Sequence, residues 1–196
     1  MNQEDVSRPE YWQKRYEDGT TGWDAGEITE PLRQYFEGLA DKSLRILIPG
    51  AGNAWEAEWL HLNGFRNVTV LDMAPAPLKN IADRLPDFPS EHLVLDDFFN
   101  HSATYDLIVE QTFFCAINPA RRMEYAQKMH QLLAPGGVLA GVLFNCHFDG
   151  GPPFGGSAAD YRLIFEPLFK LRTFEPCRNS IAPRAGRELF IVLEKK

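Results

Sequence analysis

Residues 45–60, RILIPGAGNAWEAEWL, restrict the fold more than any other part of the sequence. An apolar run at 45–50 leads through two glycines into a segment with helical character at 54–63. A strand, a glycine turn and a helix in this order present backbone N–H groups to a nucleotide-like ligand. Gly50 and Gly52 fit the first two glycines of the dinucleotide-binding pattern, but Trp55 stands at the third. The turn therefore predicts an α/β fold with a ligand site and leaves the ligand open.

The rest of the chain alternates between strand-like and helix-like segments. The expected strands are 45–50, 67–72, 91–97, 105–111, 136–145, 169–177 and 187–195. The expected helices are 54–63, 75–85, 119–133 and 156–169. Strands that alternate with helices form a parallel sheet with both faces covered, and the last two strands have no helix between them. We therefore expect a single α/β domain over 1–196, with a doubly wound, mostly parallel, seven-stranded sheet.

The N-terminal segment, residues 1–44, differs from the rest of the chain. RPEYWQKRYEDGTTGWDAGE is rich in aromatic and charged residues and has no strand pattern. It indicates a helix that begins near Pro9, followed by a glycine-rich loop at 19–26. Because ligands of open α/β sheets lie beyond the C-terminal ends of the strands, we expect this aromatic segment to form a lid there.

Composition argues against several classes of protein. A net charge of −7 over 196 residues is unfavourable for binding nucleic acid, which needs a basic face. The N-terminus lacks the pattern of a signal peptide, and the most apolar run, 138–144, is too short to span a bilayer. Cys115, Cys146 and Cys177 form neither a disulfide framework nor a zinc motif. We expect a cytoplasmic protein, without nucleic-acid, membrane or metal partners, and a monomer.

Acidic residues follow the expected strands in a pattern that suits adenosine. Asp72 stands at the end of the second strand, twenty residues after Gly52, where a carboxylate accepts hydrogen bonds from a ribose diol. Asp96, Asp97 and Phe98 follow the third strand. A carboxylate beside an aromatic ring suits the amino group and face of adenine, and of the two acids we select Asp97. Nothing in the turn requires a phosphate.

The combined motifs resemble the class I S-adenosylmethionine (SAM) methyltransferases. Within that superfamily the chain resembles the thiopurine S-methyltransferase family and, in particular, its thiol and halide methyltransferase branch, from about Tyr11 to the C-terminus. The motifs that carry the resemblance are YWQKRYEDGTTGWDAG, LIPGAGN, VLDMAP, LDDFF, FFCAINPARR, LAPGG, GGPPF and SIAPRAGRE.

The resemblance implies SAM as cofactor and a small molecule as methyl acceptor. The cofactor-binding residues that we expect are Trp12, Tyr16, Trp23, Gly50, Gly52, Asp72, Asp97, Phe98 and Gln111. Arg122 matches an arginine near the substrate in the thiopurine enzymes, and Phe114 and Phe154 offer an acceptor apolar contact. Gln111 and Phe154 replace tyrosines of the halide enzymes, and these departures favour a thiol over a halide.

Methyl transfer from a sulfonium is an in-line displacement, and alignment alone is worth about 7–11 kcal/mol in favourable intramolecular cases. A thiol is partly ionised at neutral pH, so we expect neither a catalytic base nor a covalent nucleophile. Transfer to a halide or chalcogen acceptor at the same site remains an alternative. So do an NAD(P)-dependent oxidoreductase on the same fold and a non-catalytic SAM-binding module.

Overall fold

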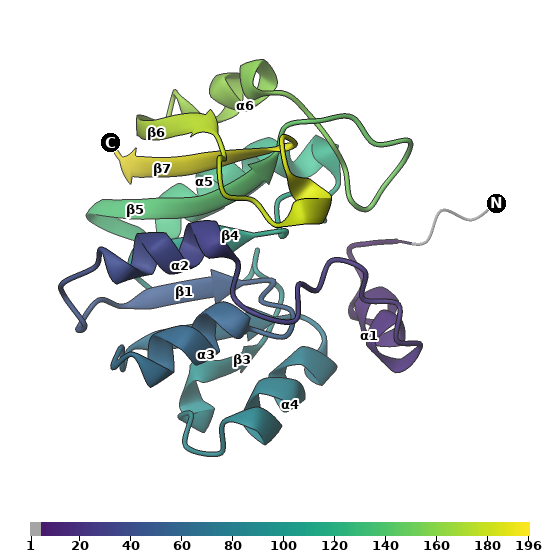
Figure 1. The fold of residues 1–196 in the computed structure, drawn as a ribbon, viewed down its shortest axis with the longest axis vertical. Helices are drawn as coiled ribbons and strands as arrows, with labels where there is room; N and C mark the ends of the chain where they lie inside the picture. The colour runs from purple at the N-terminus through teal and green to yellow at the C-terminus, as the bar shows by residue number, and fades with distance from the viewer. Residues whose placement is uncertain (1–4) are drawn as a thin grey trace.

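A computed structural model describes residues 5–196 and contains one mixed sheet of seven strands (Figure 1). The strand order is β3-β2-β1-β4-β5-β7-β6. Strands β1 to β5 pair in parallel, whereas β7 is antiparallel to both β5 and β6. The expected fold class is confirmed, and the structure shows that the terminal pair of strands is antiparallel.

The strands are β1 (Ile46–Pro49), β2 (Val68–Asp72), β3 (Leu93–Leu95), β4 (Tyr105–Gln111), β5 (Leu133–Phe144), β6 (Phe169–Pro176) and β7 (Glu188–Lys195). The α-helices are α1 (Pro9–Glu17), α2 (Glu30–Glu37), α3 (Trp55–Leu62), α4 (Pro75–Arg84), α5 (Arg122–Leu132) and α6 (Ala158–Phe165). Three short 3₁₀ turns, η1 (Ser90–His92), η2 (Pro119–Arg121) and η3 (Ala182–Arg184), join them.

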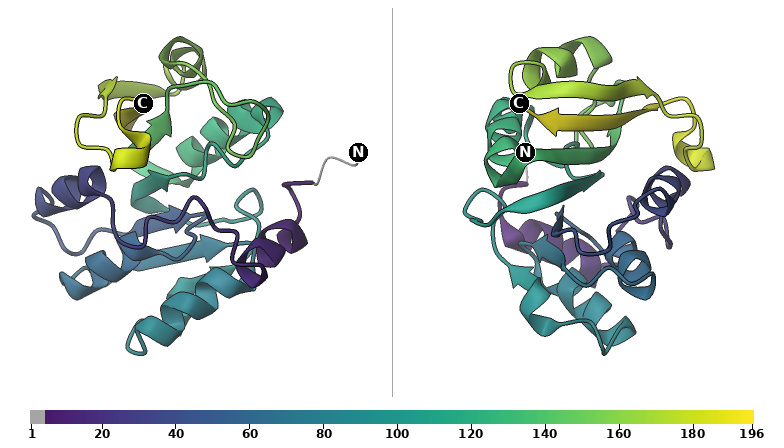
Figure 2. Two further views of the ribbon diagram at one scale, coloured as in Figure 1. Left: turned by 45° about the vertical axis from the view of Figure 1, so that its right-hand side comes forward. Right: turned by 90° about the vertical axis from the view of Figure 1, so that its left-hand side faces the viewer.

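Helices cover both faces of the sheet, as Figure 2 shows in its right-hand view. Helices α2, α3 and α4 bury residues such as Leu32, Leu60 and Ile81 against one face. Helices α5 and α6 bury Tyr125, Met129 and Phe165 against the other. This burial explains why the central parallel strands consist almost entirely of apolar residues.

The third strand is shorter than expected. Residues 91–97 were predicted as strand, but Pro89 leads into the 3₁₀ turn η1, and only Leu93–Leu95 pairs with β2. Asp96 and Asp97 therefore stand in the loop that leaves the sheet edge.

The N-terminal segment 1–44 is not uniform. Helix α2, which the sequence analysis did not separate from the aromatic segment, buries Leu32 and Phe36 completely in the core. Helix α1 buries none of its residues and stands at the edge toward which the β1 arrow points (Figure 1). Only the part that precedes α2 has the position expected of a lid. None of the helices in the described range has the length and apolar character needed to cross a bilayer.

Candidate active site

The C-terminal ends of four neighbouring strands open into one cavity. The sheet order places Asp97 after β3, Asp72 at the end of β2, Gly50 after β1 and Gln111 at the end of β4. The cavity has an empty volume of about 1150 Å³, its open mouth included. All the expected cofactor-binding residues line it, namely Trp12, Tyr16, Trp23, Gly50, Gly52, Asp72, Asp97, Phe98 and Gln111.

The glycine turn has a backbone that few residues other than glycine adopt. Gly50 and Gly52 both have φ of +56°. A Cβ atom on Gly50 would stand 2.1 Å from the ring of Phe113, so glycine is needed there for space as well as for conformation. Ala54, which precedes α3, also has φ of +56°. The turn therefore exposes backbone to the cavity at the start of α3.

Asp72 is buried at the floor of the cavity and fastens two loops. Its carboxylate accepts the Ala74 N–H at 2.9 Å and the Gly52 N–H at 3.3 Å. Burial raises the pKa of Asp72 to about 6, because desolvation outweighs these hydrogen bonds. Each oxygen keeps a lone pair for a further donor, as binding a diol requires.

Three aromatic rings of the N-terminal segment pack edge to face beside the turn. The ring centroid of Trp23 lies 5.6 Å from that of Trp12 and 5.8 Å from that of Tyr16. The Tyr16 hydroxyl and the Trp23 Nε1 lie 3.4 and 3.6 Å from the position of a Cβ on Gly52. Burial and the neighbouring Asp72 carboxylate raise the pKa of Tyr16, so its hydroxyl stays protonated.

Asp96 and Asp97 both line the β3 side of the cavity. The Asp97 carboxylate accepts the Phe99 N–H at 2.9 Å, and the Asp96 carboxylate accepts the Asp97 N–H at 2.8 Å. Phe98 is only 3% exposed and packs against Phe113, so its ring supports the wall more than it faces the cavity.

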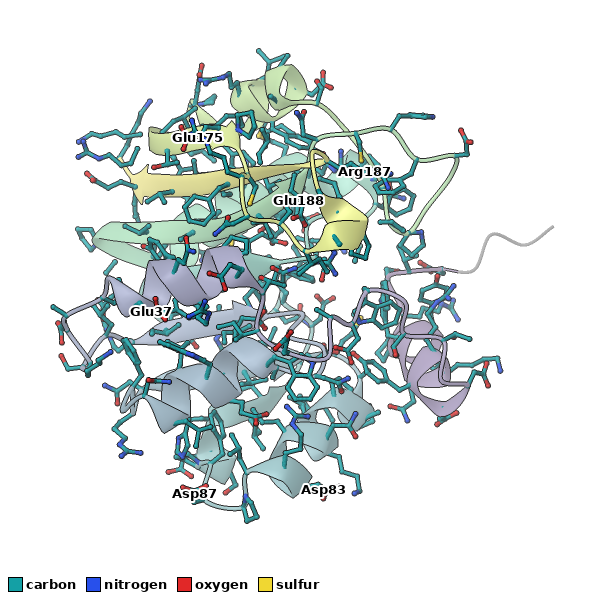
Figure 3. The ribbon with its side chains drawn as sticks, viewed as in Figure 1. Glu37, Asp83, Asp87, Glu175, Arg187 and Glu188 are labelled. Atoms are coloured by element: carbon teal, nitrogen blue, oxygen red, sulfur yellow. The ribbon has the colours of Figure 1, made fainter. Side chains whose placement is uncertain are left out.

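The β4 side of the cavity contains, among the described residues, one polar group that lacks a partner, on Gln111, and the ion-paired Arg184 also lines the cavity. Thr29 donates to the Gln111 Oε1 at 3.1 Å, and the Gln111 Nε2 has no hydrogen-bond partner within residues 5–196. Arg184, from η3, donates through Nη2 to the Trp23 carbonyl at 2.5 Å. Its buried Nη1 forms an ion pair with the Glu188 carboxylate, 3.7 Å away, beside η3 (Figure 3).

The cavity is strongly acidic. Its charged lining residues, among those described, are the six acids Asp24, Glu27, Glu56, Asp72, Asp96 and Asp97 and the two arginines Arg121 and Arg184. Burial raises the pKa of Glu56 to about 7, so this acid is partly protonated near neutrality. Such a lining attracts a cation and disfavours the two phosphates of a dinucleotide.

The three residues expected at the acceptor do not line this cavity. Arg122 is 7% exposed and donates to the carbonyls of Gly155 at 2.9 Å and Phe154 at 2.8 Å. Its guanidinium lies over the ring of Phe114, which is 1% exposed. The ring of Phe154 packs on Gly151. These residues hold the 145–157 loop to the core, because their contacts are used within the protein.

Other lining residues carry no assignment from the sequence analysis, among them Asp24, Thr29, Glu56, Phe99, Arg121 and Arg184. Arg184 lies in the SIAPRAGRE motif and Asp24 in the GWDAG stretch. The sequence therefore showed the motifs but not that these two side chains face the cavity. Thr29 and Glu56 gave no sequence signal, because each is a single polar residue in an ordinary setting.

Comparison with known proteins decides the family. The profile of the Thiopurine S-methyltransferase (TPMT) family matches residues 7–194. The chain belongs to this family. It is 32% identical over 184 residues to Thiocyanate methyltransferase 1 of Brassica oleracea, an alignment that covers 90% of this chain and 81% of that protein. It is 30% identical over 184 residues to Probable thiol methyltransferase 2 of Arabidopsis thaliana, with the same coverage.

A solved structure supports the fold of this TPMT-family chain. The 1,6-didemethyltoxoflavin-N1-methyltransferase of Burkholderia thailandensis, solved with bound S-adenosylhomocysteine, superposes with a TM-score of 0.76 at 17% identity. The match covers 96% of this chain and 87% of that structure. The expected recognition, methyltransferase activity and SAM cofactor are confirmed, and the oxidoreductase and non-catalytic alternatives are set aside.

The residues present fit SAM. The cofactor carries a sulfonium and no phosphate, which agrees with the excess of acids in the cavity. The three aromatic rings beside the glycine turn can face a sulfonium, and cation–π attraction is worth about 0.5–2 kcal/mol. Asp72 lines the same cavity beside the glycine turn, and its carboxylate can accept further hydrogen bonds from a ligand.

Proposed function

We propose that this methyltransferase acts on a small organic thiol, which attacks as its thiolate. The observation that carries the proposal is the buried Gln111 Nε2 on the β4 side, a donor that has no hydrogen-bond partner among the described residues. Buried donors without partners are costly in a folded protein unless a ligand satisfies them. An anionic sulfur meets that need.

The sheet order supports an orientation for the cofactor. We assign the adenine to Asp97 beyond β3, where the buried Phe98 ring supports the cavity wall, and the ribose to Asp72 beyond β2. Continuing along the same edge, the sulfonium falls near Gly50 beyond β1, beneath Trp12, Tyr16 and Trp23. The acceptor then lies toward β4, where the unpartnered Gln111 amide is.

The chain's residues provide alignment and charge stabilisation in this scheme. When bound, SAM supplies an electrophilic methyl group. Gln111 would donate to the sulfur anion and hold it on the far side of that methyl group, in line with the bond that breaks. A hydrogen bond to the thiolate lowers the pKa of a thiol from about 8.5, so the proton can leave to water without a dedicated base.

The names of the relatives agree with a sulfur acceptor, since they include a thiol and a thiocyanate methyltransferase. The Phe113 ring and the aromatic rings at the mouth favour an organic thiol over a bare anion. Burial of apolar surface adds about 25 cal/mol per Å², which iodide cannot exploit.

Initial rates with an aryl thiol, an alkyl thiol, thiocyanate and iodide test the proposal. Rates are compared at one pH and corrected for the ionised fraction of each acceptor. We expect the organic thiols to have the highest kcat/KM, and Gln111→Leu to lower it at least about tenfold, as for one hydrogen bond to a charged group. If iodide is the better acceptor after correction, a halide function replaces this proposal.

We also propose that residues 9–27 act as a lid over the cofactor. The support is that α1 buries no residue, while its rings line the cavity. Hydrogen exchange with and without S-adenosylhomocysteine tests it, and we expect stronger protection of 9–27 in the bound state. Equal protection in both states would make the segment a fixed strap.

We further propose a cytoplasmic monomer that needs no partner beyond its cofactor and acceptor. The support is that the three cysteines, Cys115, Cys146 and Cys177, are free thiols, as a reducing compartment favours. Sedimentation of the purified protein tests the oligomeric state, and a dimer at micromolar concentration would contradict it.

A further inference from the structure

Asp24, in the segment that precedes α2, bonds to the loop that begins α3. Its carboxylate accepts the indole N–H of Trp55 at 2.7 Å and an amide N–H of Asn53. It also accepts the backbone N–H of Gly26 at 2.9 Å, within its own segment. The acid thus joins the lid to the cofactor-binding turn.

The partners of Asp24 are themselves held in place by α4. The Arg84 guanidinium lies 4.0 Å over the Trp55 ring and donates to the Asn53 carbonyl. Arg84 also donates to the Glu58 carboxylate at 2.8 Å, and Asn80 donates to the Asn53 side chain at 2.8 Å. Asn53 and Trp55 are therefore held by α4 and cannot move together with the lid. If the lid opens, its hydrogen bonds to these two residues break.

Asp24 is adjacent in sequence to Trp23, whose ring stands over Gly52. Helix α1, which precedes this part of the chain, buries no residue. Two further hydrogen bonds tether the segment, from the Ala76 N–H to the Gln13 side chain at 3.0 Å and from Arg184 to the Trp23 carbonyl at 2.5 Å. The Asp24–Trp55 bond is thus a large part of what fixes the Trp23 and Tyr16 rings over the turn.

We propose that Asp24 is a positioning residue for the cofactor and that Trp55 is its anchor. This pairing explains why a tryptophan occupies the place where a dinucleotide-binding turn has its third glycine. The indole N–H of Trp55 bonds to Asp24 and holds the lid, and we call this hydrogen bond the latch. Asp24 also lines the cavity and could act on the cofactor directly through its charge. Two different substitutions separate these effects.

The test compares Asp24→Asn with Trp55→Phe. Asp24→Asn removes the charge and weakens the latch, whereas Trp55→Phe removes only the donor and keeps both the charge and a ring under Arg84. Binding of S-adenosylhomocysteine is measured by calorimetry, without any acceptor, so the result does not depend on the proposed thiol. We expect each variant to raise the dissociation constant about tenfold, as for one charge-assisted hydrogen bond. The double variant is expected to bind no more weakly than the weaker single one.

Two matched controls make the same chemical changes away from the latch. Trp59→Phe alters another tryptophan of α3, which packs on Phe36, and Asp18→Asn alters an exposed acid that pairs with Lys14 at the end of α1. We expect both to bind S-adenosylhomocysteine as the wild type does. The thermal midpoint of the unliganded Trp55→Phe variant should also stay close to that of the Trp59→Phe control.

The latch predicts a kinetic signature as well. The loss in Trp55→Phe should appear in the KM for SAM rather than in kcat, and exchange of residues 9–27 should accelerate in the bound state. Wild-type binding in Trp55→Phe overturns the proposal, and combined with weak binding in Asp24→Asn it would assign Asp24 a purely electrostatic role. Additive losses in the double variant also overturn it.

Discussion

The backbone N–H of Gly52 donates to the Asp72 carboxylate across 3.3 Å. This bond fastens the turn after β1 to the end of β2, beside the Ala51 N–H that donates to the Leu71 carbonyl at 3.3 Å. The acid that we assign to the ribose is therefore also a support for the glycine turn. Removal of the Asp72 carboxylate is therefore expected to weaken cofactor binding both directly and through the glycine turn.

Replacement of Asp72 by alanine should weaken binding of S-adenosylhomocysteine more than about tenfold, because the carboxylate makes charge-assisted hydrogen bonds. Calorimetry on the folded variant measures this. Asp83→Ala, an exposed acid at the end of α4 (Figure 3), is the control and should bind normally. An unchanged dissociation constant in Asp72→Ala would remove Asp72 from the cofactor site.

Replacement of Gly50 by alanine should both destabilise the protein and impair cofactor binding. The residue has φ of +56°, and the new Cβ would overlap the Phe113 ring. Gly64→Ala is the matched control, since Gly64 has φ of +88° and no atom within 4 Å of the added Cβ. Strain alone is worth about 1–2 kcal/mol, so urea unfolding should show a larger loss for Gly50→Ala. Equal losses would mean that Phe113 moves aside freely.

Replacement of Arg122 by methionine should lower the free energy of unfolding by about 2–3 kcal/mol, because two buried charge-assisted hydrogen bonds to the 145–157 loop are lost. Urea unfolding measures this, with Arg162→Met, which breaks an exposed ion pair with Glu166, as a nearly neutral control. The KM for the acceptor should rise less than in Gln111→Leu. A larger rise of this KM in Arg122→Met would indicate that Arg122 contacts the acceptor.

The stability of the protein should depend on pH through Glu110. This buried acid accepts the N–H groups of Phe113 and Phe114 and the Tyr125 hydroxyl. Burial raises its pKa from 4.5 to about 7. The unfolded chain therefore loses this proton first as pH rises, and the folded state is increasingly disfavoured between those two values.

Glu110→Gln removes that titration and leaves the other groups in place. The unfolding free energy of the wild type relative to this variant should fall by up to about 1.4 kcal/mol per pH unit between pH 4.5 and about pH 7. Above that range the difference should level off, since both states are then ionised. Urea unfolding at several pH values checks this, and parallel curves would contradict it.

The sequence by itself determined the α/β class, the order of the strands along the chain and the cofactor end of the site. Gly50, Gly52, Asp72 and Asp97 follow successive apolar strands, and parallel strands bring their C-terminal ends to one edge. Short-range patterns are sufficient for such residues, because a residue's position relative to its own strand decides where it lies. The sequence did not predict helix α2 as a separate element, because eight residues beside an aromatic segment carry little periodic signal.

Only the tertiary structure decided which arginine faces the cavity and what Trp55 does. Arg122 and Arg184 both lie in recognisable motifs, but the packing of α5 against Gly155 directs one into the protein, while η3 brings the other to Trp23, 161 positions away in sequence. Trp55 meets Asp24 across 31 positions. The direction of a long polar side chain depends on which distant backbone groups lie within its reach, and chain folding alone brings those groups there.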